Sequence, residues 1–322
     1  MSANQKVALI VGATGQDGAY LSHHLVGEGY KVVGTTRDVA SANISRLRAV
    51  GVEEYVELIT VLPHDFRSIS KAVLNINPDE IYNLAGQTSV GLSFEQPTEA
   101  IDSIANATIN WLEAIRLLSP KTPFFNAGSS ECFGDSRGTE ADEQTPFSPR
   151  SPYAIAKASA IWYVKNYRES YGLKCCTGIM SNHESPLRGK RFVTQKIVTA
   201  VQEIRDGVRA DLKLGNLDVW RDWGWSADYS RAIHLMLTQN YSFEDFVIAT
   251  GESHSLKEFT ELVFAHAGLN WRDFVHVSDN LLRPNELEYS ALNPKRIKEA
   301  LNWEPTLFFP DIVNKLCQNC LF

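Results

Sequence analysis

The sequence has little cysteine, and its cysteines form no recognisable pairing pattern. There are five of them, an odd number, without the regular spacing of a disulfide framework. Cys317 and Cys320 have a CxxC spacing, but no second pair is present to complete a zinc site. We therefore expect reduced thiols, no structural metal and a cytoplasmic location, rather than a secreted protein held together by disulfides.

Long hydrophobic runs and an excess of positive charge are also missing. No apolar stretch approaches the roughly 20 residues of a membrane span, and the first residues lack the features of a signal peptide. The formal net charge is −7, which gives no reason to expect a nucleic acid or an anionic membrane as a partner. Repeats and low-complexity tracts are absent too, so we expect a globular protein that binds a small molecule.

What the sequence does contain is an alternation of short apolar runs and amphipathic segments. The runs are typical of buried parallel strands and cover residues 7–11, 31–35, 55–61, 80–84, 123–127 and 174–179. Segments with helical periodicity stand between them, at residues 20–28, 68–76, 101–118 and 153–171. This alternation predicts an α/β fold of the Rossmann type, a doubly wound parallel sheet with helices on both faces.

The alternation becomes less regular after residue 180. Helical segments reappear at residues 194–206, 227–239 and 256–268, among stretches rich in glycine, proline and tryptophan. We therefore expect a dinucleotide-binding domain over residues 1–180, to which some later segments return. A smaller α/β substrate-binding domain is expected over residues 181–322.

Three glycines follow the first apolar run directly and precede the first helical segment. Gly12, Gly15 and Gly18 have GxxGxxG spacing. Glycine lets the backbone approach a pyrophosphate, and a helix N-terminus offers free N–H groups and a positive dipole end to it. The position of this triplet predicts a dinucleotide-binding turn, with an ordinary tight turn as the alternative.

The end of the second predicted strand bears on which dinucleotide is bound. Thr35 and Thr36 are neutral there, and the following Arg37 suits the 2′-phosphate of NADP. Asp38 would repel that phosphate, so NAD stays open. Asp65, after the third strand, can accept a hydrogen bond from the adenine amino group or be a solvated loop residue.

A group of residues able to transfer protons follows the fifth strand and opens the next helical segment. Tyr153 and Lys157 are four residues apart, which places both side chains on one helix face. A nearby ammonium and the nicotinamide charge would make the phenol a usable base. Ser129 can donate to a substrate oxygen, and Glu131 offers a second acid/base group, as abstraction of a proton next to a carbonyl requires. As alternatives to a catalytic role, the spacing of Tyr153 and Lys157 can arise by chance, and Glu131 can cap a turn.

Several stretches resemble the extended short-chain dehydrogenases/reductases, and within them the GDP-mannose 4,6-dehydratase family. They include GATGQDGAYL, AGSSECFG, SPRSPYAIAK, NHESPLRG and LGNLDVWRDWG. The resemblance implies a lyase that makes GDP-4-keto-6-deoxymannose by C4 oxidation, loss of water across C5–C6 and hydride return to C6. It implies that Tyr153 takes the C4 hydroxyl proton, that Glu131 removes the C5 proton, and that Ser129 and Lys157 orient and polarise the sugar.

The resemblance also implies two sets of binding residues. Those for NADP, with NAD possible, are Gly12, Thr14, Gly15, Gln16, Asp17, Gly18, Arg37, Asp65, Phe66, Leu84, Ala85, Gln87, Tyr153, Lys157, His183 and Arg188. Those for the GDP-sugar are Ser89, Ser129, Glu131, Asn182, Glu184, Val193, Lys196, Leu214, Gly215, Asn216, Arg221, Arg283 and Glu286.

Some positions differ from the family pattern. The family usually has threonine at Ser129, serine at Gly128 and a bulky apolar residue at Ser181, where we expect a wider or wetter sugar pocket. These differences keep open a dehydratase, epimerase or reductase acting on a related nucleotide sugar such as a GDP-heptose. A catalytically inactive NADP-binding subunit is the alternative outside the enzymes, and the complete set of acid/base residues disfavours it.

The resemblance further implies a homodimer or homotetramer. Family members pair through two long helices, here at residues 101–118 and 153–171. The loop at residues 40–48 would contact the cofactor of a neighbouring subunit.

Overall fold

The larger part of the protein is a seven-stranded sheet. The structure is a computed structural model that describes residues 5–136, 138–282 and 284–322. The strand order is β10-β6-β5-β4-β1-β2-β3, and every neighbouring pair is parallel. The strands are β1 (Val7–Val11), β2 (Lys31–Thr36), β3 (Val56–Thr60), β4 (Glu80–Asn83), β5 (Phe124–Ala127), β6 (Cys175–Met180) and β10 (Phe246–Ile248). The predicted doubly wound α/β fold is confirmed.

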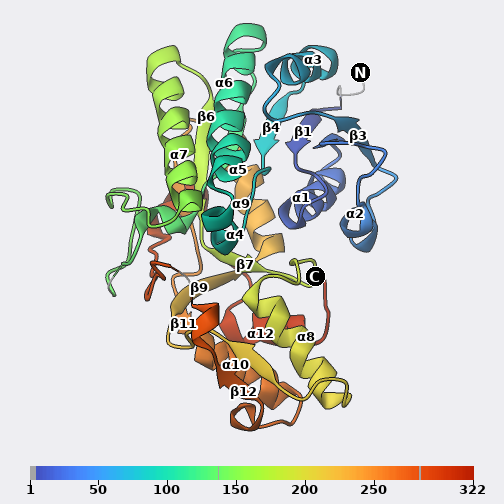
Figure 1. The fold of residues 1–322 in the computed structure, drawn as a ribbon. Coiled ribbons are helices and arrows are strands. Elements are labelled where there is room, and N and C mark those ends of the chain that lie inside the picture. Colours follow the sequence, from blue (N-terminus) through green and yellow to red (C-terminus); the bar gives the residue numbers. More distant parts are fainter. Residues whose placement is uncertain (1–4, 137, 283) are drawn as a thin grey trace.

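Helices cover both faces of this sheet (Figure 1). Side chains of α1 and α9 pack together on one face, while α3, α6 and α7 cover the other. The helices of this part are α1 (Gln16–Gly27), α2 (Ser45–Ala49), α3 (Phe66–Ile76), α4 (Val90–Glu95), α5 (Pro97–Ile101), α6 (Ala107–Leu118), α7 (Pro152–Tyr171), α9 (Ser226–Thr238) and α11 (Lys295–Leu301). From β1 the successive strands are added first toward β3 and then, from β4 onward, on the opposite side of β1. In such sheets ligands bind beyond the carboxyl ends of the strands where this order reverses, here between β1 and β4.

The single helix expected over residues 101–118 is interrupted. A π-helical turn, η1 (Asp102–Asn106), joins α5 to α6. The Ser103 hydroxyl donates to the Glu99 carbonyl at 2.7 Å and accepts the Gln87 N–H at 3.1 Å. The wide turn therefore forms where the helix meets the loop that follows β4, a tertiary contact that local periodicity does not encode.

The sheet gains its seventh strand from the second half of the chain. β10 pairs with β6 at the edge, with Phe246 opposite Gly178. α9 packs on α1, so late segments lie against the sheet built by the first half.

The smaller part is built from two short sheets and three helices, and its core contains Trp223, Trp225, Phe259 and Phe309. β9 lies between β11, which is antiparallel to it, and β7, which is parallel; β8 pairs with β12. The elements are β7 (Asn182–Glu184), α8 (Val193–Arg205), β8 (Leu212–Leu214), β9 (Trp220–Trp225), β11 (Ser253–Ser255), α10 (Leu256–His266), β12 (Val275–Val277) and α12 (Phe309–Cys317). Among the helices of the described residues, none combines the length and apolar character needed to cross a membrane.

Candidate active site

The glycine turn lies between β1 and α1, and two of its glycines are required by the backbone itself. Gly12 has φ +89°, a conformation that other residues rarely adopt. A Cβ added at Gly18 would lie 2.3 Å from the Gly12 carbonyl oxygen and 2.6 Å from the Ala13 Cα. Gly18 therefore lets the first turn of α1 pack against the preceding loop.

The N-terminus of α1 is open toward a ligand. Gly15 is the N-cap, and no side chain of the described residues makes a capping hydrogen bond to it. A Cβ at Gly15 would meet only the Gly12 carbonyl oxygen, at 3.3 Å. Free N–H groups, the positive dipole end and the lack of side chains fit the diphosphate of a dinucleotide. Thr14 and Gln16 flank Gly15 in this turn.

The end of β2 carries an exposed cation. The Thr35 hydroxyl faces the glycine turn and accepts the Gly12 N–H at 3.3 Å. The Arg37 side chain is exposed. Asp38 is held within its own loop, where it accepts the Ala40 N–H at 3.0 Å and the Ser41 hydroxyl at 2.8 Å. The negative charge that would oppose a 2′-phosphate is thus turned toward a local loop.

The residues after β3 and β4 line the same edge of the sheet. Asp65 caps α3 by accepting the Arg67 N–H at 3.1 Å, and Phe66 is exposed beside it. Leu84 and Ala85 follow β4, and the Ala85 Cα would lie 3.1 Å from a Cβ at Gly12.

The next loop is rigid. Gln87 donates to the Ser89 carbonyl at 2.8 Å and accepts the Ser89 N–H at 2.9 Å. The Ser89 hydroxyl also caps α4 by accepting the Leu92 N–H. Both predicted ligand contacts therefore lie in a loop that its own hydrogen bonds hold in place.

The predicted serine, tyrosine and lysine come together at the carboxyl end of β5. Ser129 follows β5 and leads into η2 (Ser130–Phe133), while Tyr153 and Lys157 lie in the first turns of α7. The side chains of Ser129 and Tyr153 are hydrogen-bonded. Lys157 Nζ donates to the Ala127 carbonyl at 2.6 Å and lies 5.9 Å from the centre of the Tyr153 ring. All three side chains are buried.

Burial sets the charge of this group. It raises the pKa of the Tyr153 phenol above its ordinary value, although the Ser129 hydrogen bond opposes the shift. It lowers the pKa of the Lys157 ammonium to about 8. In the chain alone, desolvation of the phenol therefore outweighs the groups that favour its ionised form. A further positive charge nearby is needed for Tyr153 to act as a base.

Glu131 lies in η2, two residues after Ser129, and lines a small pocket. The other side of this pocket is formed by Arg150 and Ser151, just before α7, and by residues 284–287. Glu286 belongs to that segment and pairs with Arg221 at 3.2 Å. The pocket thus joins the predicted acid/base residue to one predicted substrate contact, Glu286, and through its ion pair to Arg221. Arg283 lies outside the described residues.

Residues of β7 contact the first residues of α1, next to the glycine turn. His183 Nε2 lies 3.0 Å from Asp17 Oδ1, and the Gln16 side chain donates to the His183 carbonyl at 3.2 Å. Burial alone would raise the pKa of the Asp17 carboxyl, but His183 holds it well below its usual range. Asn182, partly buried, opens β7, opposite Trp223 of β9.

Two further predicted residues stabilise the start of α8. Glu184 accepts the Thr194 hydroxyl at 2.7 Å and lies 3.6 Å from Arg188 Nε. The Arg188 guanidinium lies over the Phe192 ring, 3.9 Å from its centre. The two charged side chains are therefore fixed before any ligand binds.

Other predicted substrate contacts lie farther out in the smaller part. Val193 and Lys196 belong to the start of α8, and Lys196 Nζ donates to the Lys213 carbonyl at 2.7 Å. Leu214 ends β8; Gly215 and Asn216 follow it. A Cβ at Gly215 would lie 2.8 Å from the Leu281 carbonyl oxygen. Lys196 and Arg221 therefore make separate contacts within the described chain.

Two findings differ from the sequence analysis. Ser181 belongs to a buried polar cluster that the sequence did not indicate, because its hydroxyl donates to Asp222 at 2.9 Å and is hydrogen-bonded to Tyr229. Arg46 was not predicted as a site residue, yet its guanidinium reaches the glycine turn, 3.3 Å from the Thr14 carbonyl. A single arginine in a short helix carries no local signal of such a contact.

Comparison with known proteins agrees with this geometry. The family model described as GDP-mannose 4,6 dehydratase matches residues 9–316. GDP-mannose 4,6 dehydratase 2 of Arabidopsis thaliana is 42% identical, over 97% of this chain and 86% of that protein. GDP-mannose 4,6-dehydratase of Vibrio cholerae is 39% identical, over 94% and 90% respectively.

Two solved structures share the fold. The dTDP-glucose 4,6-dehydratase of Streptomyces venezuelae, with NAD bound, has a TM-score of 0.86 at 20% identity, covering 97% of this chain and 96% of that one. The UDP-glucose 4-epimerase of Thermus thermophilus, also with NAD, has a TM-score of 0.84 at 24% identity, covering 98% of each chain.

Proposed function

This chain belongs to the GDP-mannose 4,6-dehydratase family, and we propose that it removes one water molecule from GDP-mannose to give GDP-4-keto-6-deoxymannose. One observation carries the proposal. Ser129, Tyr153 and Lys157 meet at the carboxyl end of β5, with Glu131 two residues after Ser129. An epimerase or a reductase has no need of a second acid/base group at this position.

We propose that the glycine turn holds the diphosphate of a nicotinamide dinucleotide. When bound, this cofactor would accept a hydride from C4 of the sugar and return it to C6. Arg37 is exposed at the end of β2 and Asp38 is engaged elsewhere, which favours NADP over NAD. Arg46 lies against the turn, where its charge favours the diphosphate.

Tyr153 would take the proton of the C4 hydroxyl. Its pKa is raised by burial, so it becomes a base only when positive charge lies on both sides of the phenol. Lys157, with a pKa of about 8, is mostly protonated at neutral pH and supplies one such charge. Ser129 would donate to the same sugar oxygen and fix its distance from Tyr153.

Glu131 would remove the C5 proton once C4 is a ketone, because the carbonyl acidifies that position. The protonated carboxyl would then donate to the departing C6 hydroxyl, so that the two steps leave Glu131 as it began. Hydride return to C6 would be completed by a proton added at C5, which balances the proton that Tyr153 took from the C4 hydroxyl. Its place in a pocket closed by residues 284–287 would keep bulk water from the intermediate.

The diphosphate and the sugar would lie between the two parts of the chain. Arg221, buried and paired with Glu286, and Lys196 would neutralise the diphosphate, and Asn182 and Glu184 would contact the sugar nucleotide.

We also propose that the chain is a homodimer or homotetramer in the cytoplasm. Ile155, Trp162 and Tyr163 leave apolar surface exposed along α7, and the Trp162 side chain is 56% exposed. The five cysteines are free thiols, which suits a reducing compartment. Light scattering of wild type and Trp162→Glu tests the assembly, and a lower mass for the variant is expected.

The decisive test of the proposed function is to incubate the purified protein with GDP-mannose or with a GDP-heptose and follow the nucleotide sugar by mass spectrometry. We expect GDP-mannose to lose the mass of one water without net formation of NADPH. Net NADPH formation would show that the protein is an oxidoreductase and not a dehydratase. A product of unchanged mass would show that it is an epimerase. Faster loss of water from the GDP-heptose would show that the heptose is the preferred substrate and that the reaction is still a dehydration.

A further inference from the structure

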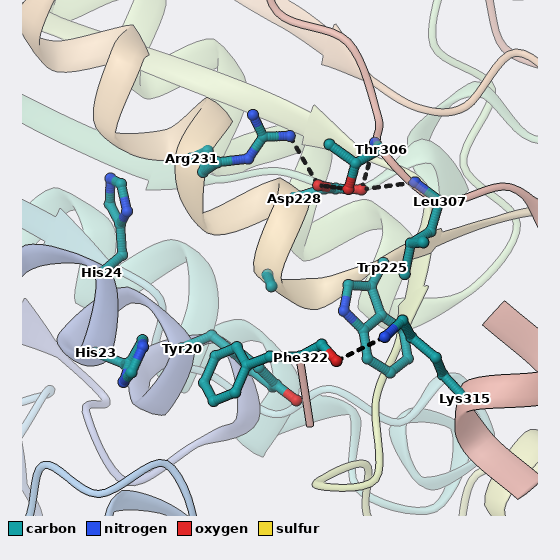
Figure 2. Close-up of a pocket in the computed structure, with 11 residues that line it drawn as sticks. Tyr20, His23, His24, Trp225, Asp228, Arg231, Thr306, Leu307, Lys315 and Phe322 are labelled. Carbon is teal, nitrogen blue, oxygen red and sulfur yellow. Dashed lines mark hydrogen bonds and ion pairs between the residues drawn. The ribbon is translucent and has the colours of Figure 1, made fainter. Parts of the chain in front are cut away.

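A second cavity lies where α1, α9 and the last described residues of the chain meet (Figure 2). Its volume is about 390 Å³, within the range of small-molecule sites. Among the described residues that line it, none is assigned above to the cofactor or the substrate. Tyr20 and Trp225 form buried walls, and the partly exposed ring of Phe322 lies 5.6 Å from the Tyr20 ring.

The charges around this cavity are unbalanced in favour of cations. Asp228, the one side-chain carboxylate among the described lining residues, already accepts the Thr306 N–H at 2.7 Å, the Thr306 hydroxyl at 2.7 Å and the Leu307 N–H at 3.3 Å. Arg231 donates to Asp228 through Nη2 only, and 40% of its side chain remains exposed.

Other basic groups complete the rim. Lys315 reaches the cavity from α12, and His23 and His24 reach it from α1. Figure 2 shows Arg231, Lys315 and the two histidines on different sides of the cavity. In a protein of net charge −7, the two cations Arg231 and Lys315 beside the single side-chain carboxylate of Asp228 favour an anion.

We infer that this cavity binds a small anion that carries an aromatic ring system. The ring would lie against Tyr20 and Trp225, as flat aromatic surfaces favour. The anionic group would lie between Arg231 and Lys315, where the guanidinium has donors to spare.

The site is linked to the glycine turn by a chain of side-chain contacts. The Tyr20 hydroxyl donates to the Leu321 carbonyl at 2.9 Å and lies beside the Ser185 side chain. Ser185 in turn donates to the Gln16 side chain at 2.9 Å, and Gln16 is the first residue of α1. Each partner of Tyr20 therefore belongs to a different part of the protein.

A ligand would disturb these contacts by displacing the last two described residues. Lys315 Nζ donates to the Phe322 carbonyl at 2.6 Å, so an anion at Lys315 competes with residues 321–322. If that segment moves, Tyr20 loses its contact with Leu321 and its hydroxyl turns fully toward Ser185. Occupation of the cavity therefore changes the affinity of the glycine turn for its dinucleotide, and the effect is reciprocal.

The binding site is tested with 1-anilinonaphthalene-8-sulfonate, an aromatic anion whose fluorescence reports binding. Saturating NADP+ and GDP are present, so that the active site is blocked. We expect one molecule bound per chain, and affinity about tenfold weaker in Lys315→Gln because a charge-assisted contact is lost. The matched control is Lys295→Gln, since Lys295 is an exposed lysine of α11 outside the cavity.

Two results would overturn this assignment: loss of all dye binding when NADP+ and GDP are added, or equal affinity in Lys315→Gln and wild type. Arg231→Gln is a second variant, but it also removes the ion pair with Asp228. Its dye affinity is therefore compared with wild type only if the variant protein unfolds at the wild-type temperature. Dye binding needs no turnover, so the outcome is independent of the dehydratase proposal.

The coupling is tested by titrating NADP+ with and without saturating dye. We expect the NADP+ dissociation constant to change severalfold in wild type and to stay unchanged in Tyr20→Phe, which keeps the ring and loses the hydroxyl. Equal constants with and without dye in wild type would refute the link to the glycine turn. An equally large effect in Tyr20→Phe would refute the route through Tyr20.

Discussion

Replacing Gly18 by alanine tests how the dinucleotide turn is built. The new methyl group would lie 2.3 Å from the Gly12 carbonyl oxygen and 2.6 and 2.8 Å from the Ala13 Cα and carbonyl carbon. All three are backbone atoms, so the turn and the helix must separate by about 1 Å to reach ordinary contact distances. Overpacking of this kind costs about 1–3 kcal/mol, against a gain of at most about 1 kcal/mol from helix propensity.

The same substitution at the other end of α1 gives a matched control. A Cβ at Gly27 meets no atom within 4 Å, so alanine there keeps the propensity gain without the collision. We expect urea denaturation to show Gly18→Ala less stable by about 1–2 kcal/mol and Gly27→Ala as stable as wild type or slightly more so. Titration of Trp fluorescence with NADPH should show weaker binding only for Gly18→Ala. Wild-type stability and affinity in Gly18→Ala would refute the packing argument.

Three further predictions concern the proton-transfer groups and a histidine pair. Glu131→Gln should keep NADP binding and lose about 10²–10⁴-fold in dehydration rate, with no exchange of the C5 proton; turnover within a few-fold of wild type would remove Glu131 from the mechanism. Tyr153→Phe should lose activity by a similar factor while unfolding at the wild-type temperature, as followed by product formation and thermal denaturation, and unchanged activity would contradict its role as a base. Burial and the neighbouring His234, 2.9 Å away, lower the pKa of His24 to about 4, so the folded chain takes up this proton less readily than the unfolded chain. Stability should therefore fall as pH decreases from 6.5 to 4, by at most about 1.4 kcal/mol per pH unit from this group, and urea denaturation should show a shallower fall in His24→Gln; equal slopes would contradict the pairing.

Much of the sheet could be predicted because buried strands and amphipathic helices leave periodic patterns. β1 was expected at the residues where it is found, and α7 began within one residue of its predicted start. The features that were missed depend on tertiary contacts. The π-helical turn at Asp102–Asn106 is held by the Gln87 N–H, and the three-residue strand β10 is too short to show any period.

The candidate site, too, could be predicted only in part. Sequence spacing alone placed Tyr153 and Lys157 on one helix face, and the position after β5 placed Ser129 beside them. Burial, which raises the pKa of the phenol, could not be read from the spacing. The packing of Arg46 on Thr14 and the hydrogen bonds of Ser181 likewise depend on residues far away in the sequence.

The most direct test of the dehydratase account uses GDP-mannose labelled with deuterium at C4. If one bound cofactor stores the hydride while Glu131 and Tyr153 exchange protons, the product should have lost the mass of one water and kept the deuterium, now at C6. Product without deuterium, or oxidised product that keeps the C6 hydroxyl, would contradict it.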